Sequence, residues 1–241
     1  MKHLLLFVAF FFVIAASARA EDEASQWAHK SQLGIALSGG NSDSQTYNVK
    51  QDTSYSWTGN RIKSSGHYLF GKAAGVAAAE NWHLDLRYER ELSEHFSVYA
   101  GPGIEGDFFS GFSNRINLGL GGKYWILPGD KKNNYLFVEA GYLHQRQNNI
   151  GGTVTNSNFI RTYAEAGKSL TDAVSTKVYV EVLPDLSQGQ NLLINFEPSI
   201  AVALSNHFSM QLAFTGRYDG LPNAGKKNFD WQYTTSLVAS Y

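Results

Sequence analysis

The last residues of the chain, KNFDWQYTTSLVASY (227–241), alternate two kinds of side chain. Aromatic, aliphatic or small side chains occupy most alternate positions from Phe229 to Tyr241, and polar residues such as Asp230, Gln232 and Thr234 fill the gaps. A period of two is that of a β-strand with one apolar and one polar face. In a soluble sheet the apolar face covers a core, whereas in a membrane barrel it faces lipid and the polar face lines the lumen. The alternation fits both arrangements, so the rest of the chain must separate them.

Residues 1–20 have the features of a secretory signal peptide. Lys2 precedes an apolar run, and Ala18 and Ala20 frame a small-x-small cleavage site. The apolar run is shorter than the ~20 residues that a membrane-spanning helix needs. We therefore expect a cleaved signal peptide over 1–20, a short periplasmic segment over 21–30 and a barrel over 31–241.

Composition excludes several classes of function. The chain has 20 Lys and Arg against 21 Asp and Glu, which gives no support to nucleic-acid binding. Cysteine is absent, so disulfides and thiolate metal sites are excluded. Aromatic residues make up 14% of the chain and only 5 residues are proline, which favours long strands.

The period of two continues almost without interruption from Gln32 to the end, and twelve segments can be separated. Beyond the signal peptide, no apolar run is long enough for a membrane-spanning helix, so a membrane location would require a closed barrel. An even strand number is typical of bacterial single-chain barrels. The sequence predicts an all-β, transmembrane, antiparallel up-and-down barrel of about 12 strands. The last strand should pair with the first around Gln32–Leu37, because pairing removes the open edge.

The connections between these segments fall into two groups. Compact turns such as TGN (58–60) and LSEHFSV (92–98) follow the even-numbered segments, whereas stretches such as GKAAGVAAAE (71–80) and DGLPNAGKKN (219–228) follow the odd-numbered ones. Outer-membrane barrels have short turns on the periplasmic side and longer loops outside. This sorting predicts the outer membrane of a Gram-negative bacterium, with both termini in the periplasm.

Nearly all charges within the predicted strands lie opposite the apolar set. Arg90 and Lys168 are exceptions, and both are close to turns where long cationic side chains reach the interface. Charges facing the lipid midplane would cost about 2–4 kcal/mol each for Lys or Arg. We therefore predict a lumen-facing charged network that consists of Asp85, Arg87, Glu89, Glu105, Arg115, Lys123, Glu139, Arg161, Glu165, Lys177, Glu181, Glu197 and Arg217.

Large rings share the predicted lumen with these charges: Tyr99, Trp125, Phe137, Tyr163 and Tyr179. Two interpretations stay open, a lumen filled by rings and ion pairs and a narrow channel for small solutes. A wide porin is disfavoured, because an aqueous pore needs roughly 16–18 strands.

A lipid-modifying hydrolase is the alternative function. Outer-membrane phospholipases and lipid A-modifying enzymes place serine and histidine on the outer face near a rim. His95 and His207 lie in matched turns, and His144 has no hydroxyl partner specified by the sequence. We predict no catalytic residues, no metal and no cofactor. Lys226 and Lys227 could contact lipopolysaccharide phosphates, but the sequence favours a solvated loop for them.

Three stretches resemble a known family. LGIALSGGNSDSQTYNV (33–49), EVLPDL (181–186) and GRYDGLPNAGKKNFDWQYTTSLVASY (216–241) are similar to the YdiY-like, salt-induced outer-membrane proteins. The resemblance implies an outer-membrane β-barrel without an established substrate and a link to salt or osmotic stress. It also implies that Tyr241 belongs to the signal that the barrel-assembly machinery recognises. Oligomeric state is left open.

Overall fold

The computed structural model describes residues 26–38, 44–128, 134–187, 191–222 and 225–241. The predicted signal peptide, 1–20, lies outside these described residues. The strands are β1 (Trp27–Ser38), β2 (Ser44–Trp57), β3 (Asn60–Ala73), β4 (Val76–Glu91), β5 (Phe96–Asp107), β6 (Phe112–Leu127), β7 (Asn134–Asn149), β8 (Val154–Ser169), β9 (Val174–Pro184), β10 (Leu192–Ala203), β11 (Phe208–Asp219) and β12 (Phe229–Ser240).

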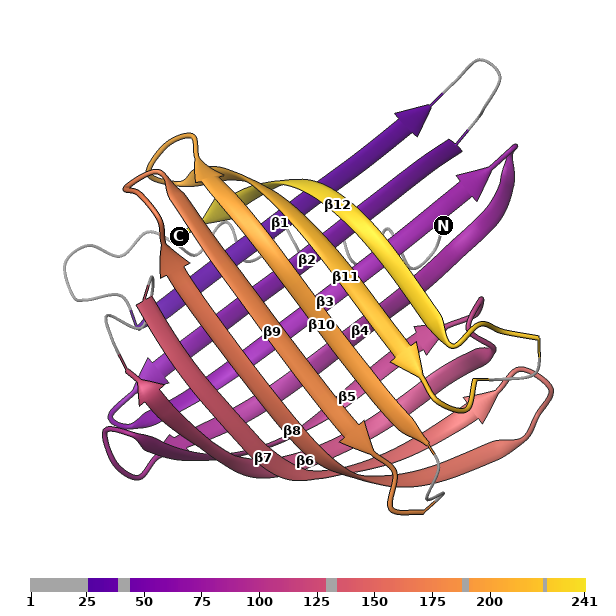
Figure 1. The fold of residues 1–241 in the computed structure, drawn as a ribbon, viewed down its shortest axis with the longest axis horizontal. Coiled ribbons are helices and arrows are strands. Elements are labelled where there is room, and N and C mark those ends of the chain that lie inside the picture. The colour runs from indigo at the N-terminus through magenta and orange to yellow at the C-terminus, as the bar shows by residue number, and fades with distance from the viewer. Residues whose placement is uncertain (1–25, 39–43, 129–133, 188–190, 223–224) are drawn as a thin grey trace.

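Each strand pairs antiparallel with its neighbours in the sequence, and β12 pairs with β1 to close the barrel (Figure 1). The predicted 12-stranded up-and-down barrel is confirmed. Among the described residues, no helix is long and apolar enough to cross a membrane. We call the end that carries the start of β1 and the end of β12 the terminal rim, and the opposite end the distal rim.

The closing pair is short. β1 and β12 are in register over Lys30↔Ser240 to Leu33↔Leu237, whereas β7 and β8 are in register from Asn134↔Lys168 to Asn148↔Val154. The predicted pairing of the last strand with the first is confirmed, although it lies closer to the chain ends than Gln32–Leu37.

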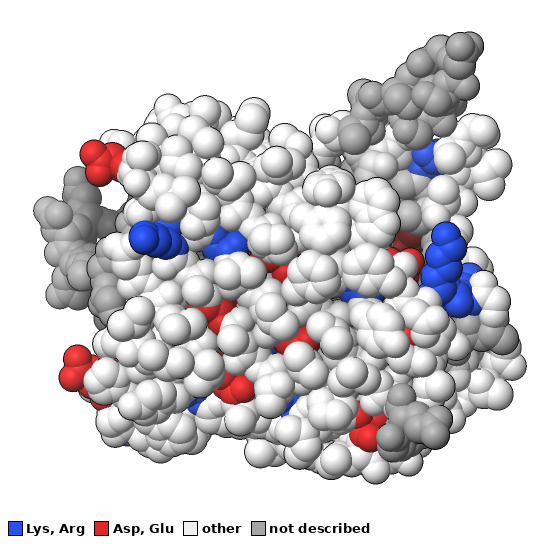
Figure 2. All heavy atoms as spheres, viewed as in Figure 1, with Lys and Arg blue, Asp and Glu red and all other residues white. Residues whose placement is uncertain are grey.

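Alternation sets the two faces of the wall. On β12, Trp231 and Tyr233 are 61% and 66% exposed on the outside, and Gln232 and Thr234 alternate with them. Figure 2 shows a wall made mostly of uncharged residues, with charged residues towards its ends and in narrow gaps. Because large hydrophobic side chains such as Leu84, Leu118 and Val180 are exposed on it, the outside is an apolar surface of the kind that faces lipid.

Two expectations about boundaries were wrong. β1 begins at Trp27, so residues 27–30 belong to the barrel wall rather than to a preceding segment. The stretch 71–80 is a paired hairpin with a turn at Ala74 and Gly75, not a long loop. Both turn residues have positive φ, 48° and 76°, as a two-residue type I′ hairpin turn requires. Runs of alanine and glycine carry little apolar–polar alternation, which hides such strands.

The sorting of connection lengths is consequently weaker than predicted. Connections at the terminal rim range from residues 58–59 to 128–133, and those at the distal rim from 74–75 to 220–228. The distal ends of β1–β4 project beyond the rest of the wall as paired strands (Figure 1).

Candidate functional site

The lumen is the candidate site, because the inward face of every second residue gathers charged and aromatic side chains there. Glu139 on β7 is its first centre. Its carboxylate accepts hydrogen bonds from Arg87 at 2.7 and 3.0 Å and from Arg161 at 2.6 Å. The Arg87 guanidinium lies 3.7 Å from the centroid of the Tyr99 ring, and Arg161 donates to the Tyr99 hydroxyl at 3.0 Å. Arg161 also pairs with Glu181 at 2.6 Å.

Glu89 on β4 is the second centre and is only 1% exposed. Arg87 lies 3.2 Å from its carboxylate, and Lys63 and Lys123 each lie 3.7 Å away. Arg87 therefore joins the two carboxylates into one network that extends from Lys63 on β3 to Glu181 on β9. A buried network of this kind holds each charge only while its partners stay in place.

Aromatic rings fill the space beside these charges. The centroids of Trp125, Phe137, Tyr163 and Tyr179 follow one another at 4.9, 5.8 and 5.5 Å. The Lys123 ammonium, 2% exposed, lies 4.0 Å from the centroids of both Trp125 and Phe137. We call the set Arg87, Glu89, Tyr99, Lys123, Trp125, Phe137, Glu139, Arg161 and Tyr163 the charged–aromatic cluster.

Five other predicted network residues form separate ion pairs on the lumen side, one of them with Lys50, which was not predicted. The pairs are Glu105–Arg115 at 3.2 Å, Glu165–Lys177 at 3.8 Å and Glu197–Lys50 at 3.0 Å. Asp85 lies 3.8 Å from His83 and contacts no lysine or arginine in the described part of the chain. Arg217 has neither an ion pair nor a hydrogen bond among the residues that the structure describes. The network is therefore several groups, and Asp85 and Arg217 stand outside them.

Lumen charges on the first three strands were not predicted from the sequence. Lys30, Lys50, Asp52 and Lys63 alternate with outward-facing residues and lie inside. The alternation of outward and inward side chains was sufficient to predict them, because Val49 and Ile62 mark the outward faces of β2 and β3. The alternation is clearer from β4 onward, and the predicted network therefore begins at Asp85.

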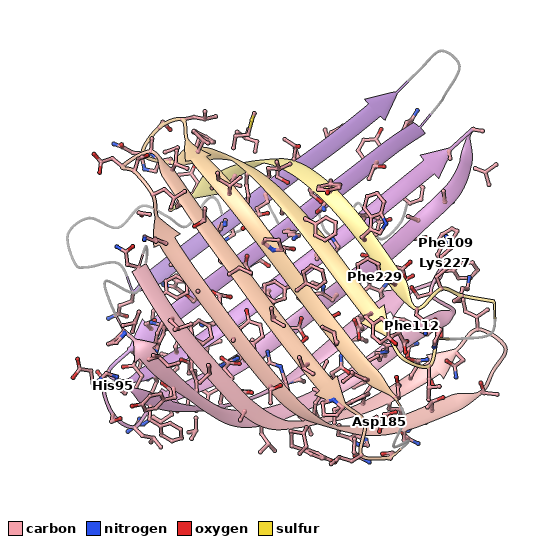
Figure 3. The ribbon with its side chains drawn as sticks, in the orientation of Figure 1. His95, Phe109, Phe112, Asp185, Lys227 and Phe229 are labelled. Carbon is pink, nitrogen blue, oxygen red and sulfur yellow. The ribbon has the colours of Figure 1, made fainter. Side chains whose placement is uncertain are left out.

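A cavity of about 1100 Å³ occupies the part of the lumen that the cluster leaves open. Its lining includes Ala28 and Tyr241 at the terminal rim and Lys226 and Lys227 at the distal rim. In Figure 3 Lys227 lies near Phe109 at the distal rim, whereas His95 lies at the opposite rim. The cavity therefore reaches both ends of the barrel, and we call it the passage.

The passage crosses the lumen obliquely between two filled regions. One is the charged–aromatic cluster near the terminal ends of β4–β8. The other is a group of buried inward side chains on the opposite wall: Gln32, Asn48, His67, Leu69 and Gln211. No residue of this second group is part of the lining of the passage, as far as the described part of the chain shows. Near the terminal rim the passage follows β1–β4, and towards the distal rim it follows β4–β11.

The charged residues that line the passage include Asp85, Arg87, Glu105, Arg161 and Arg217. Acidic and basic groups are therefore interspersed there. Within the described residues, no group of three or more His, Cys, Asp or Glu side chains could hold a metal ion.

Three histidines that the sequence analysis considered have local partners. The Nδ1 atom of His95 lies 2.9 Å from the Trp125 carbonyl oxygen, and the His207 ring stacks 5.3 Å from that of Tyr241. The Nδ1 atom of His144 lies 2.9 Å from the Asn158 side-chain oxygen.

A fourth histidine has a hydroxyl partner. The Nε2 atom of His29 lies 2.7 Å from Ser31 Oγ, and its Nδ1 atom lies 2.8 Å from Thr53 Oγ1. This group was not predicted from the sequence, because His29 falls in the segment 21–30 that was expected to precede the barrel. The backbone of His29 also pairs with that of Tyr241, with both N–H···O distances at 2.9 Å.

The described architecture is that of an outer-membrane β-barrel, and solved structures of this class are similar to it. The NanC porin matches with a TM-score of 0.54 and 10% identity, over 88% of this chain and 98% of the porin. The KdgM porin gives 0.48 and 10%, over 89% and 98%. The translocator domain of the autotransporter NalP from Neisseria meningitidis gives 0.47 and 10%, over 99% and 95%. At such identity the likeness concerns the fold alone.

The chain belongs to the family DUF481, described as a protein of unknown function, whose model matches residues 31–241. No curated protein matches the chain. The family thus agrees with the barrel region but assigns it no activity.

Proposed function

We propose that the protein is a narrow channel for small polar solutes in the outer membrane of a Gram-negative bacterium. The observation that supports this proposal most directly is the passage, because its lining includes residues at both rims of the barrel. An apolar outer wall supports the membrane location. The filled cluster explains why the passage occupies only part of the lumen and why it would admit only small solutes.

The charges of the passage suggest its selectivity. Arg87 and Arg161 are largely neutralised by their carboxylate partners, whereas Asp85 and Arg217 face the passage without such compensation. One acidic and one basic uncompensated group favour weak selectivity between small anions and cations. This differs from a lumen lined by one sign of charge, which concentrates ions of the opposite sign.

Orientation and partners belong to the same proposal. We place the termini in the periplasm, the distal rim outside, and Lys226 and Lys227 near lipopolysaccharide phosphates. Tyr241 would then serve as part of the signal for the barrel-assembly machinery during biogenesis. The resemblance to YdiY-like proteins supports a role under salt or osmotic stress.

Planar-bilayer recording of the purified protein tests the channel. We expect small, long-lived conductance steps, below those of 16-stranded porins. The complete absence of steps, with a correctly folded barrel by heat-modifiable gel mobility, would contradict the channel and favour a purely structural barrel. Measuring expression of the chromosomal gene at raised salt tests the stress link separately.

A further inference from the structure

We propose that His29, Ser31 and Thr53 form a lipid-ester hydrolase site on the outer wall of the barrel. The three side chains come from two paired strands, since Ser31 pairs with Gln51 and His29 with Thr53 in the register of β1 and β2. His29 and Ser31 are two residues apart on one strand and therefore project from the same face. By this alternation their side chains project outward with Leu33, while the residues His29 and Thr53 also border the terminal end of the passage.

A candidate nucleophile, Ser31, and an orienting group, Thr53, contact the two ring nitrogens of one candidate base, His29. Ser31 Oγ lies 2.7 Å from His29 Nε2, and Thr53 Oγ1 lies 2.8 Å from His29 Nδ1. When Nδ1–H donates to Thr53 Oγ1, Nε2 is left to accept the proton of the Ser31 hydroxyl. That tautomer is the one that a general base for a serine nucleophile requires. The Gln51 amide also donates to Thr53 Oγ1, which holds the threonine in place.

The position on the wall indicates the substrate class. Trp27, at the terminal rim, and Leu33, deeper in the wall, share the outward face of β1 with His29 and Ser31 and are 59% and 49% exposed. The Trp27 ring lies 4.7 Å from that of Tyr55, and such rings sit at membrane interfaces. The His29–Ser31 pair thus lies between an interfacial aromatic pair and an apolar surface. In a membrane lipid, the acyl ester lies between the polar head and the hydrocarbon chain.

The chemical step is acyl transfer followed by hydrolysis. Ser31 Oγ attacks the ester carbonyl carbon while His29 Nε2 takes the hydroxyl proton. The bond between the carbonyl carbon and the leaving oxygen breaks, and the proton passes to that oxygen, which releases the lysolipid alcohol. Water then attacks the acyl–serine ester, with His29 again transferring the proton, and releases the fatty acid and free Ser31.

Thr53 is a positioning residue in this proposal, because it acts on the substrate only through His29. Replacing Thr53 with valine removes the oxygen that orients the ring, while Thr53→Ser keeps it. We expect Thr53→Val to slow the reaction of Ser31 and Thr53→Ser to restore it. A purely structural threonine would instead lower barrel stability without this selective rescue.

The experiment uses the purified full barrel in vesicles of phosphatidylethanolamine and phosphatidylglycerol. A fluorophosphonate probe, which forms a bond between phosphorus and an activated serine oxygen with loss of fluoride, measures nucleophile activation. Release of a fluorescently labelled fatty acid from a phospholipid measures turnover. We expect the probe on Ser31 by peptide mass spectrometry and loss of both signals in Ser31→Ala and His29→Ala.

His144→Ala is the matched control, because His144 also faces outward and contacts Asn158 but has no direct serine partner among the described residues. We expect this variant to keep both signals. An unlabelled Ser31 in the native protein, or equal fatty-acid release by Ser31→Ala, would overturn the site. Labelling without lipid cleavage would overturn the lipid as substrate. Heat-modifiable gel mobility reports the folding of each variant whether or not the barrel conducts, so failure of the hydrolase site and failure of the channel are distinguishable.

Discussion

The charged–aromatic cluster and the passage share one lumen but use their charges differently. In the cluster, Glu139 is held by two arginines and Lys123 lies between two rings with almost no exposure. In the passage, Asp85 and Arg217 line open space and form no ion pair with a lysine, an arginine or a carboxylate among the described residues. The difference teaches that an enclosed charge in the lumen is fixed by its partners, whereas an exposed one is left accessible, which under the proposed channel function is where selectivity would arise.

Breaking the cluster should have the largest effect. Replacing Glu139 with glutamine leaves Arg87 and Arg161 without their shared carboxylate. We expect the free energy of unfolding to fall by about 3–5 kcal/mol, the usual cost of removing one partner from a buried ion pair. Denaturant unfolding of the detergent-solubilised barrel, followed by tryptophan fluorescence, measures it. Asp85→Asn is the control and should change stability by no more than about 0.5 kcal/mol; equal losses would refute the contrast.

A smaller loss should follow from replacing Arg161 with lysine. Lysine keeps the charge but cannot bridge Glu139, Glu181 and the Tyr99 hydroxyl with one planar group. We expect a loss of about 1.5–3 kcal/mol, the range for hydrogen bonds to charged groups. The same unfolding experiment checks it. Stability equal to that of the native barrel would mean that charge alone, without the fork geometry, holds the cluster.

Narrowing the passage should reduce conductance without breaking the cluster. Gly103 lines the passage, and a Cβ there would meet Asp85 Oδ1 at 2.1 Å, so a side chain must displace that flexible carboxylate. We expect Gly103→Phe to lower single-channel conductance roughly tenfold, a factor equivalent to about 1.4 kcal/mol. Gly103→Ala should cause a lesser decrease in the same planar-bilayer recording. Unchanged conductance in the phenylalanine variant would place the conducting path elsewhere.

Reversing one exposed charge should have the smallest effect. Arg217→Glu changes the sign of a side chain in the passage. Opposite charges about 4 Å apart interact by about 1 kcal/mol in water, so permeability should shift a few-fold towards cations. The reversal potential under a salt gradient measures this shift, and stability should be unaffected. A shift of similar size in Lys168→Glu, on the outer wall, would show that the passage is not the origin of the selectivity.

Strand number and facing direction could be predicted from particular residues. Trp231 and Tyr233 indicated the outer face of β12. Glu89, Lys123 and Glu139 were predicted to face the lumen because they alternate with apolar residues along their strands. The hairpin in the alanine-rich segment 71–80 was not predicted, because small side chains give little contrast between an apolar and a polar face. The contacts of Glu139 could not be predicted, since alternation assigns a face but not the height at which side chains on different strands meet.

The amino-acid sequence by itself determined a closed barrel of twelve strands and the faces that their side chains take, because a period of two is a local property of each strand. Only the tertiary structure decided which charges are enclosed and which line the passage. It also brought Thr53 to His29 and Ser31. These outcomes depend on strand register and tilt, which arise when all the strands pair and the barrel closes.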